Sequence, residues 1–323
     1  MPGARGGLAV PSRSSETGGA MSETWYIDDE SQYVKVIKEA PVAQVVLNRP
    51  ERLNCWLTGQ ELEIARAFEQ LNGKEHEDVK AVIFRGEGRS FSSGYDVTEL
   101  GTQYWEPGED TKTRPTQRRR LHVDAEGRNV LRAVFQSRKV VIGELKGYVL
   151  GGAFEFVLGC DILIAAEGTI IGSPPARMVA AAGMSSSFSI LRLGPALYSE
   201  MMLLGRFISA EEGYERGLVN RVVPLDDLEE TTQAAADLAS LIPTDGIAIH
   251  KLQSRLAYNT LGFESTLAAS NMSHTLQVQQ RLGEHDWNLF TERRDHGAKE
   301  AYRRRDQRFR DAIERFNPRG PII

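Results

Sequence analysis

The sequence contains little cysteine: Cys55 and Cys160 are the two cysteines in 323 residues. Both lie in apolar surroundings, and their separation matches no metal-binding motif, so the sequence offers neither a disulfide framework nor a metal site. Two reduced thiols are typical of a protein in a reducing compartment, which predicts a cytoplasmic location.

Long apolar runs and an excess of positive charge are also missing. No segment approaches the roughly 20 apolar residues that span a bilayer, so we expect no membrane partner. The net charge of −5 argues against nucleic acid as a partner. We interpret the arginines at 118–120 and 303–305 as solvated helix faces, and a phosphate-contacting role for the first group stays open. With 41% hydrophobic and 26% charged residues, the chain is typical of a globular protein.

The chain divides into three regions by composition. Residues 1–24 begin with a stretch rich in glycine, serine and proline, which predicts a disordered extension rather than a targeting signal. Residues 25–225 alternate between strand and helix patterns and predict an α/β core. Residues 226–323 are mainly helical, with segments expected at 228–241, 246–258, 263–282 and 286–315.

Within the core, hydrophobic periodicity predicts strands at 33–37, 43–47, 79–84, 140–142 and 161–166. Helices are expected from Thr58, over 118–135 and over 153–158. Strand–helix–strand order predicts parallel strands joined by right-handed crossovers.

The most informative stretch is GELKGYVLGGAFEFVLGCDI at 143–162. Gly151 and Gly152 open a short helix, whose first amides have no partner within the helix and suit an oxygen that becomes negative during a reaction. Glu155 follows one turn later among apolar residues. Two interpretations are open: a site for charge stabilisation and proton transfer, or a tight strand–helix junction with Glu155 facing solvent.

Three other segments accompany this stretch: NRPERLN at 48–54, SFSSGYD from Ser90, and LLGRFISAEEGYERGLVNRVVP at 203–224. Together the four motifs, in this order and spacing, resemble the enoyl-CoA hydratase/isomerase (crotonase) family over roughly residues 30–225. The resemblance implies an α/β fold built as a crotonase-like spiral of ββα units. It also implies that the C-terminal helices form an oligomerisation region for a homotrimer or homohexamer.

The resemblance further implies an enzyme that acts on acyl-CoA thioesters. Coenzyme A would arrive as part of the substrate, with no permanently bound cofactor. The amides of Tyr95 and Gly152 would form an oxyanion hole, and Tyr95, Asp96, Val97 and Thr98 would line the acyl-CoA site together with Gly152. Glu155 would be the acid–base group.

The sequence departs from the family pattern at one chemically important position. Pro175 stands where the family has its second glutamate, so ordinary two-glutamate hydration is in doubt, and a single-carboxylate enzyme or a catalytically degenerate CoA-thioester-binding protein is expected. The glycine-rich turn that follows is replaced by AAAGMSSS from Ala180. His122 is a candidate for the missing catalytic group, and Lys251 is expected to be exposed. Trp105, Phe154, Met178 and Met184 are candidates for shaping an apolar acyl pocket.

Overall fold

The structure is a computed structural model that describes residues 22–99, 103–105, 108–110, 113–178, 186–277, 279–318 and 320–321. The predicted disordered extension, residues 1–24, lies outside the described residues as far as residue 21, and its end is wrong because Glu23 and Thr24 begin a strand. The departure from the family pattern that begins at Ala180, with Met184, lies outside the described residues as far as residue 185.

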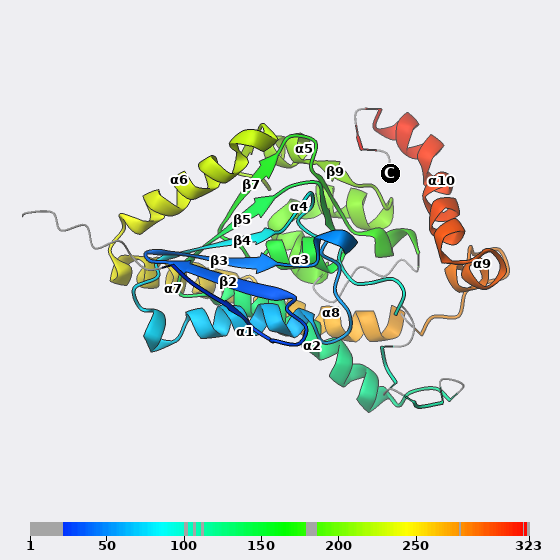
Figure 1. Cartoon of the computed structure of the whole chain (residues 1–323). Coiled ribbons are helices and arrows are strands. Elements are labelled where there is room, and N and C mark those ends of the chain that lie inside the picture. Colours follow the sequence, from blue (N-terminus) through cyan, green and yellow to red (C-terminus); the bar gives the residue numbers. More distant parts are fainter. Residues whose placement is uncertain are drawn as a thin grey trace, which may run out of the picture.

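A seven-stranded sheet forms the centre of the molecule (Figure 1). Its first three strands are antiparallel and the others are parallel. In spatial order the strands are β1 (Glu23–Tyr26), β2 (Val34–Glu39), β3 (Val42–Leu47), β4 (Ala81–Gly86), β5 (Val140–Leu145), β7 (Ile162–Ala166) and β10 (Arg221–Val223). The five strands predicted from periodicity are therefore confirmed, with ends shifted by up to three residues.

A second sheet of three short strands stands beside the first: β6 (Tyr148–Leu150), β8 (Ile170–Gly172) and β9 (Ile208–Ser209). The chain adds one strand to the large sheet, then one strand to the small sheet, and then forms a helix. It runs through β5, β6 and α3 (Gly152–Val157), and then through β7, β8 and α4 (Ser186–Leu203). Repetition of this unit is the ββα spiral expected from the sequence.

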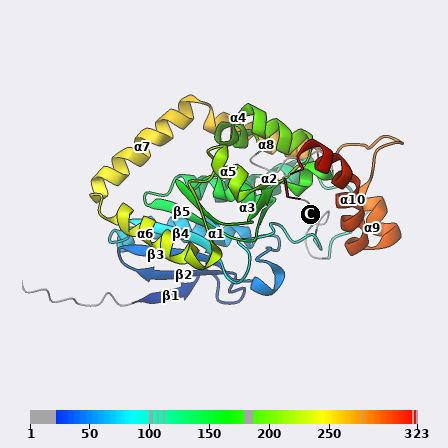
Figure 2. The ribbon, with the colours of Figure 1, turned by 90° about the horizontal axis from the view of Figure 1, so that it is seen from above.

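The large sheet is buried on both faces, as the near-continuous apolar residues of its parallel strands, such as β4, require. On one face, Val82 and Phe84 belong to the main core, against which α1 (Glu61–Leu71) and α2 (Gln117–Phe135) pack. On the other face, Ala81 and Ile83 face α6 (Leu228–Ser240), which lies across β4, β5 and β7 (Figures 1 and 2). The remaining short helices are η1 (Pro50–Arg52), η2 (Lys74–His76), η3 (Pro174–Arg177), α5 (Ala210–Glu215) and η4 (Leu225–Asp227).

The C-terminal region contains α7 (Thr244–Thr260), α8 (Phe263–Gln277), α9 (Leu289–His296) and α10 (Ala298–Phe316). The single helix expected over 286–315 is wrong: Gly297, with φ +78°, interrupts it and starts α10 in a new direction. α8 packs on α2 and α4, whereas α9 and α10 stand at the end of the molecule to which β3 and β4 point (Figure 1). The domain boundary at 225/226 remains a prediction.

Lys251 is not exposed, contrary to expectation. Its side chain is buried, and Nζ lies 2.6 Å from a carboxylate oxygen of Asp161, which also accepts a hydrogen bond from the amide of Val141. The pair ties α7 to the start of β7, so Lys251 is a structural residue. Among the described residues, no helix combines the length and apolar character that a membrane span requires.

Candidate active site

Three segments meet where the chain passes from one sheet to the other. The amide of Ser92 donates to Tyr148 O at 2.9 Å, and the amide of Leu150 donates to Ser92 O at 3.0 Å. The amide of Gly151 then donates to Gly172 O at 2.9 Å. These bonds fix the loop after β4, the start of α3 and the segment before η3 relative to one another.

Tyr95 lies in a short backbone ladder with Trp56. The amide of Trp56 donates to Gly94 O at 3.1 Å, and the amide of Asp96 donates to Trp56 O at 2.8 Å. In this parallel bridge the hydrogen bonds to Trp56 come from Gly94 and Asp96, the residues on either side of Tyr95, and not from Tyr95 itself. The N–H of Tyr95 therefore points away from Trp56.

Gly94 brings this loop into contact with the start of α3. A Cβ atom at Gly94 would lie 3.4 Å from the nitrogen of Gly152 and 2.6 Å from the oxygen of Leu150, and its φ is +90°. Only glycine permits both the conformation and the approach. The amide of Gly152, in the first turn of α3, has no acceptor within the helix. The two amides predicted to form an oxyanion hole thus belong to adjoining backbone segments.

Glu155 lies three residues beyond Gly152 on α3, a spacing that places both on one face of the helix. Its side chain is buried, with 5% of the residue exposed. The alternative in which Glu155 faces solvent is wrong. The neighbouring Phe154 and Phe156 are buried as well, so Glu155 lies in a buried part of α3.

Trp56 is a site residue that sequence reasoning missed. Its indole stacks on Phe156 at a centroid distance of 5.1 Å. Its Cζ2 lies 2.7 Å from the position of a Cβ on Gly152. The ring therefore covers the backbone of the predicted oxyanion donor. The only signal in the sequence was its place two residues after the NRPERLN motif, and a single tryptophan there is typical of a core residue.

The 95–98 loop contains exposed residues, whereas the carboxylate of Asp96 within it is hydrogen-bonded to other groups of the protein. Asp96 accepts from Arg49 Nη1 at 3.1 Å, from Thr98 Oγ1 at 2.7 Å and from the amide of Thr98 at 3.0 Å. Burial alone would raise the pKa of Asp96, but the hydrogen bonds from Thr98 and the charge of Arg49 lower it below its usual range. Val97 and Thr98 are exposed.

The hydroxyl of Tyr95 is also engaged, with Thr58 and Glu99, and burial raises its pKa. The residue thus contributes its amide, and its side chain braces the loop against the start of α1.

The segment that contains Pro175 supplies no carboxylate. Pro174 and Pro175 begin η3. Proline is tolerated there because the first amides of a helix make no hydrogen bond within the helix, so the missing N–H of proline costs none. Ser173 Oγ, just before them, is buried and has no hydrogen-bond partner among the described residues. Arg177 is directed to Asp306 of α10, with Nη1 2.9 Å from Oδ1.

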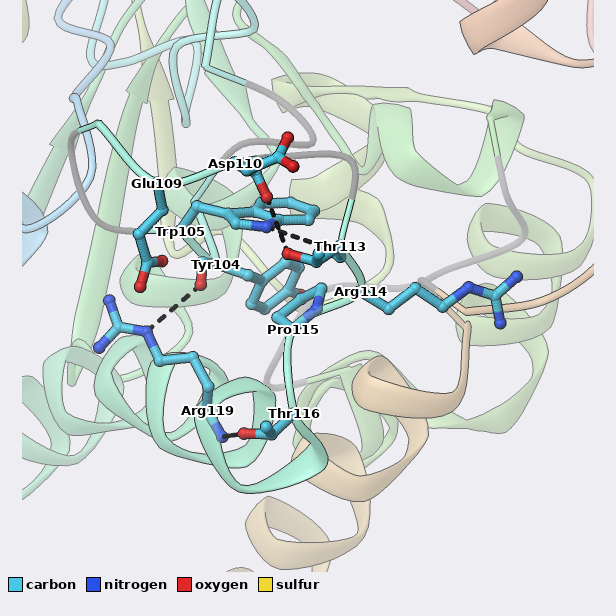
Figure 3. Close-up of a pocket in the computed structure, with 9 residues that line it drawn as sticks. All are labelled: Tyr104, Trp105, Glu109, Asp110, Thr113, Arg114, Pro115, Thr116 and Arg119. Carbon is cyan, nitrogen blue, oxygen red and sulfur yellow. Dashed lines mark hydrogen bonds between the residues drawn. The ribbon is translucent and has the colours of Figure 1, made fainter.

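A hollow of about 490 Å³ lies beside the start of α2 (Figure 3). The indole of Trp105 donates to Thr113 O at 3.0 Å, and Arg119 donates to Tyr104 O at 3.3 Å. Trp105 is the one predicted pocket residue among the nine that line it: Tyr104, Trp105, Glu109, Asp110, Thr113, Arg114, Pro115, Thr116 and Arg119. His122, further along α2, is exposed.

Comparison with known sequences identifies the family. The sequence pattern of the enoyl-CoA hydratase/isomerase family matches residues 37–300. The chain belongs to the enoyl-CoA hydratase/isomerase family. A probable mitochondrial enoyl-CoA hydratase of Dictyostelium discoideum is 29% identical over 266 residues, which cover 80% of this chain and 87% of the relative. A probable enoyl-CoA hydratase (echA8) of Mycobacterium leprae is 32% identical over 230 residues, covering 70% and 80%.

Solved structures agree with this assignment. An enoyl-CoA hydratase/isomerase from Xanthobacter autotrophicus Py2 superposes with a TM-score of 0.73 at 28% identity and covers 85% of this chain and 98% of that chain. An enoyl-CoA hydratase from Mycobacterium smegmatis has the same TM-score at 22% identity, covering 85% and 94%, and supports the fold. The crotonase fold predicted from the motifs is confirmed.

Proposed function

We propose that the protein is an acyl-CoA-processing enzyme that stabilises a thioester enolate between the amides of Tyr95 and Gly152. The observation that carries the proposal is the contact of Gly94 with Gly152, because it places the two amides on adjoining backbone with Glu155 one helical turn away. Family membership makes a CoA thioester the expected substrate. Coenzyme A arrives with the substrate, and no permanent cofactor is required.

The chemistry follows from the charge that the reaction creates. When Glu155 removes a proton from the carbon next to the thioester carbonyl, the electron pair moves onto the carbonyl oxygen. Two fixed N–H donors can stabilise that oxygen, at about 3–4 kcal/mol each in comparable sites. If the acyl chain has a double bond between its β and γ carbons, the negative charge is shared with the γ carbon; Glu155 can then return the proton to that carbon, and the double bond moves to the α,β position.

Pro175 restricts the reaction class. Two-glutamate hydration needs a second carboxylate to orient water, and η3 offers none. We therefore favour isomerisation, C–C bond hydrolysis or an unusual hydration in which Glu155 is the single carboxylate, with His122 as a candidate helper. Incubating the purified protein with a panel of acyl-CoA thioesters and following products by mass spectrometry tests this. The proposal predicts turnover of at least one thioester.

The second candidate function is that of a catalytically degenerate protein that binds a CoA thioester or an oligomeric partner. The loss of the carboxylate at Pro175 favours it. Calorimetry separates the two candidates, because this function predicts binding of acyl-CoA with no product formed from any member of the panel.

We also propose a homotrimer or homohexamer. Ile249, Leu252 and Leu256 are exposed at spacings of three and four residues, which makes one apolar face on α7 at the periphery of the molecule (Figure 2). Leu241 and Ile242, just before α7, are exposed too. Light scattering at micromolar concentration tests this assembly, and a monomeric mass would contradict it. A cytoplasmic location, without membrane or nucleic acid as a partner, completes the proposal.

A further inference from the structure

A hollow of about 690 Å³ opens between α1 and α2, which pack against each other, and α7. Four arginines line this arginine-lined hollow: Arg66 on α1, Arg132 and Arg138 on and after α2, and Arg255 on α7. Glu69 is the one acidic residue among the described residues of the lining. A concave surface with charges of mainly one sign raises the local concentration of ions of the opposite sign. The hollow therefore favours an anion.

Two of the arginines, Arg132 and Arg255, are half-buried and held in place by other groups of the protein. Nη2 of Arg132 lies 2.5 Å from a carboxylate oxygen of Glu264 on α8. Nη2 of Arg255 donates to the carbonyl oxygens of Gln136 and Ser137, just after α2. The Nε atoms of both arginines are buried and have no hydrogen-bond partner in the described part of the chain. The protein thus satisfies only part of the hydrogen-bonding capacity of these two groups.

The other two arginines, Arg66 and Arg138, are exposed. Neither guanidinium group makes a hydrogen bond or an ion pair with another described residue. The backbone amide of Arg138 donates to Oδ1 of Asn72 at 2.7 Å, which joins the segment after α2 to the end of α1. Two guanidinium groups without a protein partner therefore lie beside two whose positions are fixed.

The arginines also affect one another. Burial lowers the pKa of Arg255, the charge of Asp161 raises it, and the charge of Arg138 lowers it again. Like charges at such close range repel, and an anion between them replaces that repulsion with attraction. The cluster is therefore more favourable with a bound anion than without one.

Phosphate groups suit this lining better than a simple halide ion does. A guanidinium group is planar, keeps its charge at all ordinary pH values and binds two oxygens of one phosphate at once. The volume lies within the range of about 300–1,000 Å³ that is usual for small-molecule sites, so it has room for more than one phosphate group. Leu62, Ala65 and Ala133 add an apolar part to the lining, against which a nucleotide base can pack.

The hollow lies apart from the candidate active site. Arg138 comes two residues before β5, at the end of the sheet where the parallel strands begin. Tyr95 follows β4, and Gly152 follows β5 and β6, so the predicted oxyanion donors lie where these strands end. The six residues of β5 extend over about 20 Å. A ligand at Arg138 is therefore separate from a thioester at Tyr95 and Gly152.

We propose that the arginine-lined hollow is a second ligand site, which binds a small molecule with phosphate groups through its four arginines. This inference goes beyond the proposed function, because it concerns a different part of the molecule. The phosphate groups belong either to a free polyphosphate or to a nucleotide, and the same arginines serve both.

The test is calorimetric titration of the full chain with pyrophosphate and with ATP at low ionic strength, with and without butanoyl-CoA. Arg66→Gln and Arg138→Gln are each expected to weaken binding about 10-fold, which corresponds to the loss of one charge-assisted hydrogen bond. Glu69→Gln removes a repelling charge and is expected to strengthen binding about twofold. Arg310→Gln, an exposed arginine of α10, is the matched control and should bind as the wild type does.

Tighter binding of ATP than of pyrophosphate assigns the site to a nucleotide, whereas an affinity for ATP no higher than that for pyrophosphate assigns it to a free polyphosphate. Failure of the wild-type protein to bind either probe would overturn the inference. Unchanged affinity in both Arg66→Gln and Arg138→Gln would overturn it too, since the anion would then lie elsewhere.

Butanoyl-CoA distinguishes the arginine-lined hollow from the acyl-CoA site. Pyrophosphate is expected to bind equally well in its presence, because the two sites are separate. Displacement of pyrophosphate by butanoyl-CoA would contradict the inference. Turnover of the acyl-CoA panel is measured without either probe, so a failure of this inference leaves the proposed function intact.

Discussion

The indole of Trp56 lies against Gly152, with Cζ2 2.7 Å and Cη2 3.1 Å from where a Cβ would stand. This contact leaves no room for any side chain at the position whose amide we assign to the oxyanion hole. It joins the segment that follows the NRPERLN motif to the GG motif in space, and the aromatic ring covers the Gly152 backbone.

Gly152→Ala is therefore expected to displace the indole or the α3 backbone. Overpacking of this kind costs about 1–3 kcal/mol of stability. Misplacing one oxyanion donor lowers kcat by about 10²–10³-fold. Turnover and thermal unfolding should be measured for the same preparation. Trp56→Leu in the Gly152→Ala background should restore part of the stability.

Gly246→Ala is the matched control, because the nearest atom to its new Cβ is a side-chain carbon of Ile242 at 3.6 Å and the residue lies in α7. It should keep activity and gain some stability. Normal turnover in Gly152→Ala would show that the amide of Gly152 does not act on the substrate.

Asp306→Ala is expected to lower the free energy of unfolding by about 3–5 kcal/mol, because it leaves the guanidinium of Arg177 buried and unpaired. It should also free α10 and expose the C-terminal segment to proteases. Urea unfolding and limited proteolysis measure the two effects. Glu300→Ala is the control, since this half-exposed glutamate pairs with Arg303 and Arg304 of the same helix and not with Arg177. An equal loss in both variants would contradict the anchoring role of Arg177.

Because Glu144 is buried, we expect the stability of the protein to depend on pH. Burial raises its pKa, and Lys146, with Nζ 3.9 Å from Oε1, offsets this only in part. Because the folded pKa lies above the unfolded value of about 4.3, the protein loses stability as the pH rises from that value through the folded pKa. Glu144→Gln removes this loss.

The melting temperature of Glu144→Gln relative to wild type should therefore increase between about pH 4 and pH 8. Glu230→Gln, an exposed glutamate on the neighbouring α6, is the control and should follow the wild-type profile. A constant difference between Glu144→Gln and wild type across this range would show that burial of Glu144 carries no such cost.

Pro175 predicts that the wild-type protein hydrates crotonyl-CoA slowly, below the range of roughly 1–1000 per second that enzymes usually reach. Pro175→Glu restores a carboxylate in η3 and is expected to raise this rate. Pro174→Glu, one residue away, is the control and should not. Absorbance of the conjugated thioester follows the reaction. Rapid hydration by the wild-type protein would show that another residue, with His122 as a candidate, orients the water.

The sequence predicted the parts of the fold and the site that depend on local pattern. The strands followed from β-branched runs such as Val140–Ile142, and Tyr95, Gly152 and Glu155 were identified through motifs with fixed spacing. The structure then showed Glu155 to be buried, which periodicity over a short helix could not decide.

Long-range contacts were not predictable in the same way. Lys251 resembled a surface lysine because its partner, Asp161, lies 90 residues earlier in the chain. The break at Gly297 was missed because one glycine in a polar helical pattern is often tolerated.

The most direct test of the proposed mechanism is the turnover of Glu155→Gln on the substrate found in the acyl-CoA panel. Glutamine keeps the volume and hydrogen-bonding capacity of glutamate but cannot accept the substrate proton, and the backbone donors remain in place. We predict a kcat lower by about 10²–10⁴-fold, with acyl-CoA affinity within about tenfold of wild type. Glu215→Gln, exposed on α5, serves as the control. Wild-type turnover by Glu155→Gln, or a lower melting temperature with turnover per folded molecule preserved, would contradict the assignment of Glu155 as the acid–base group.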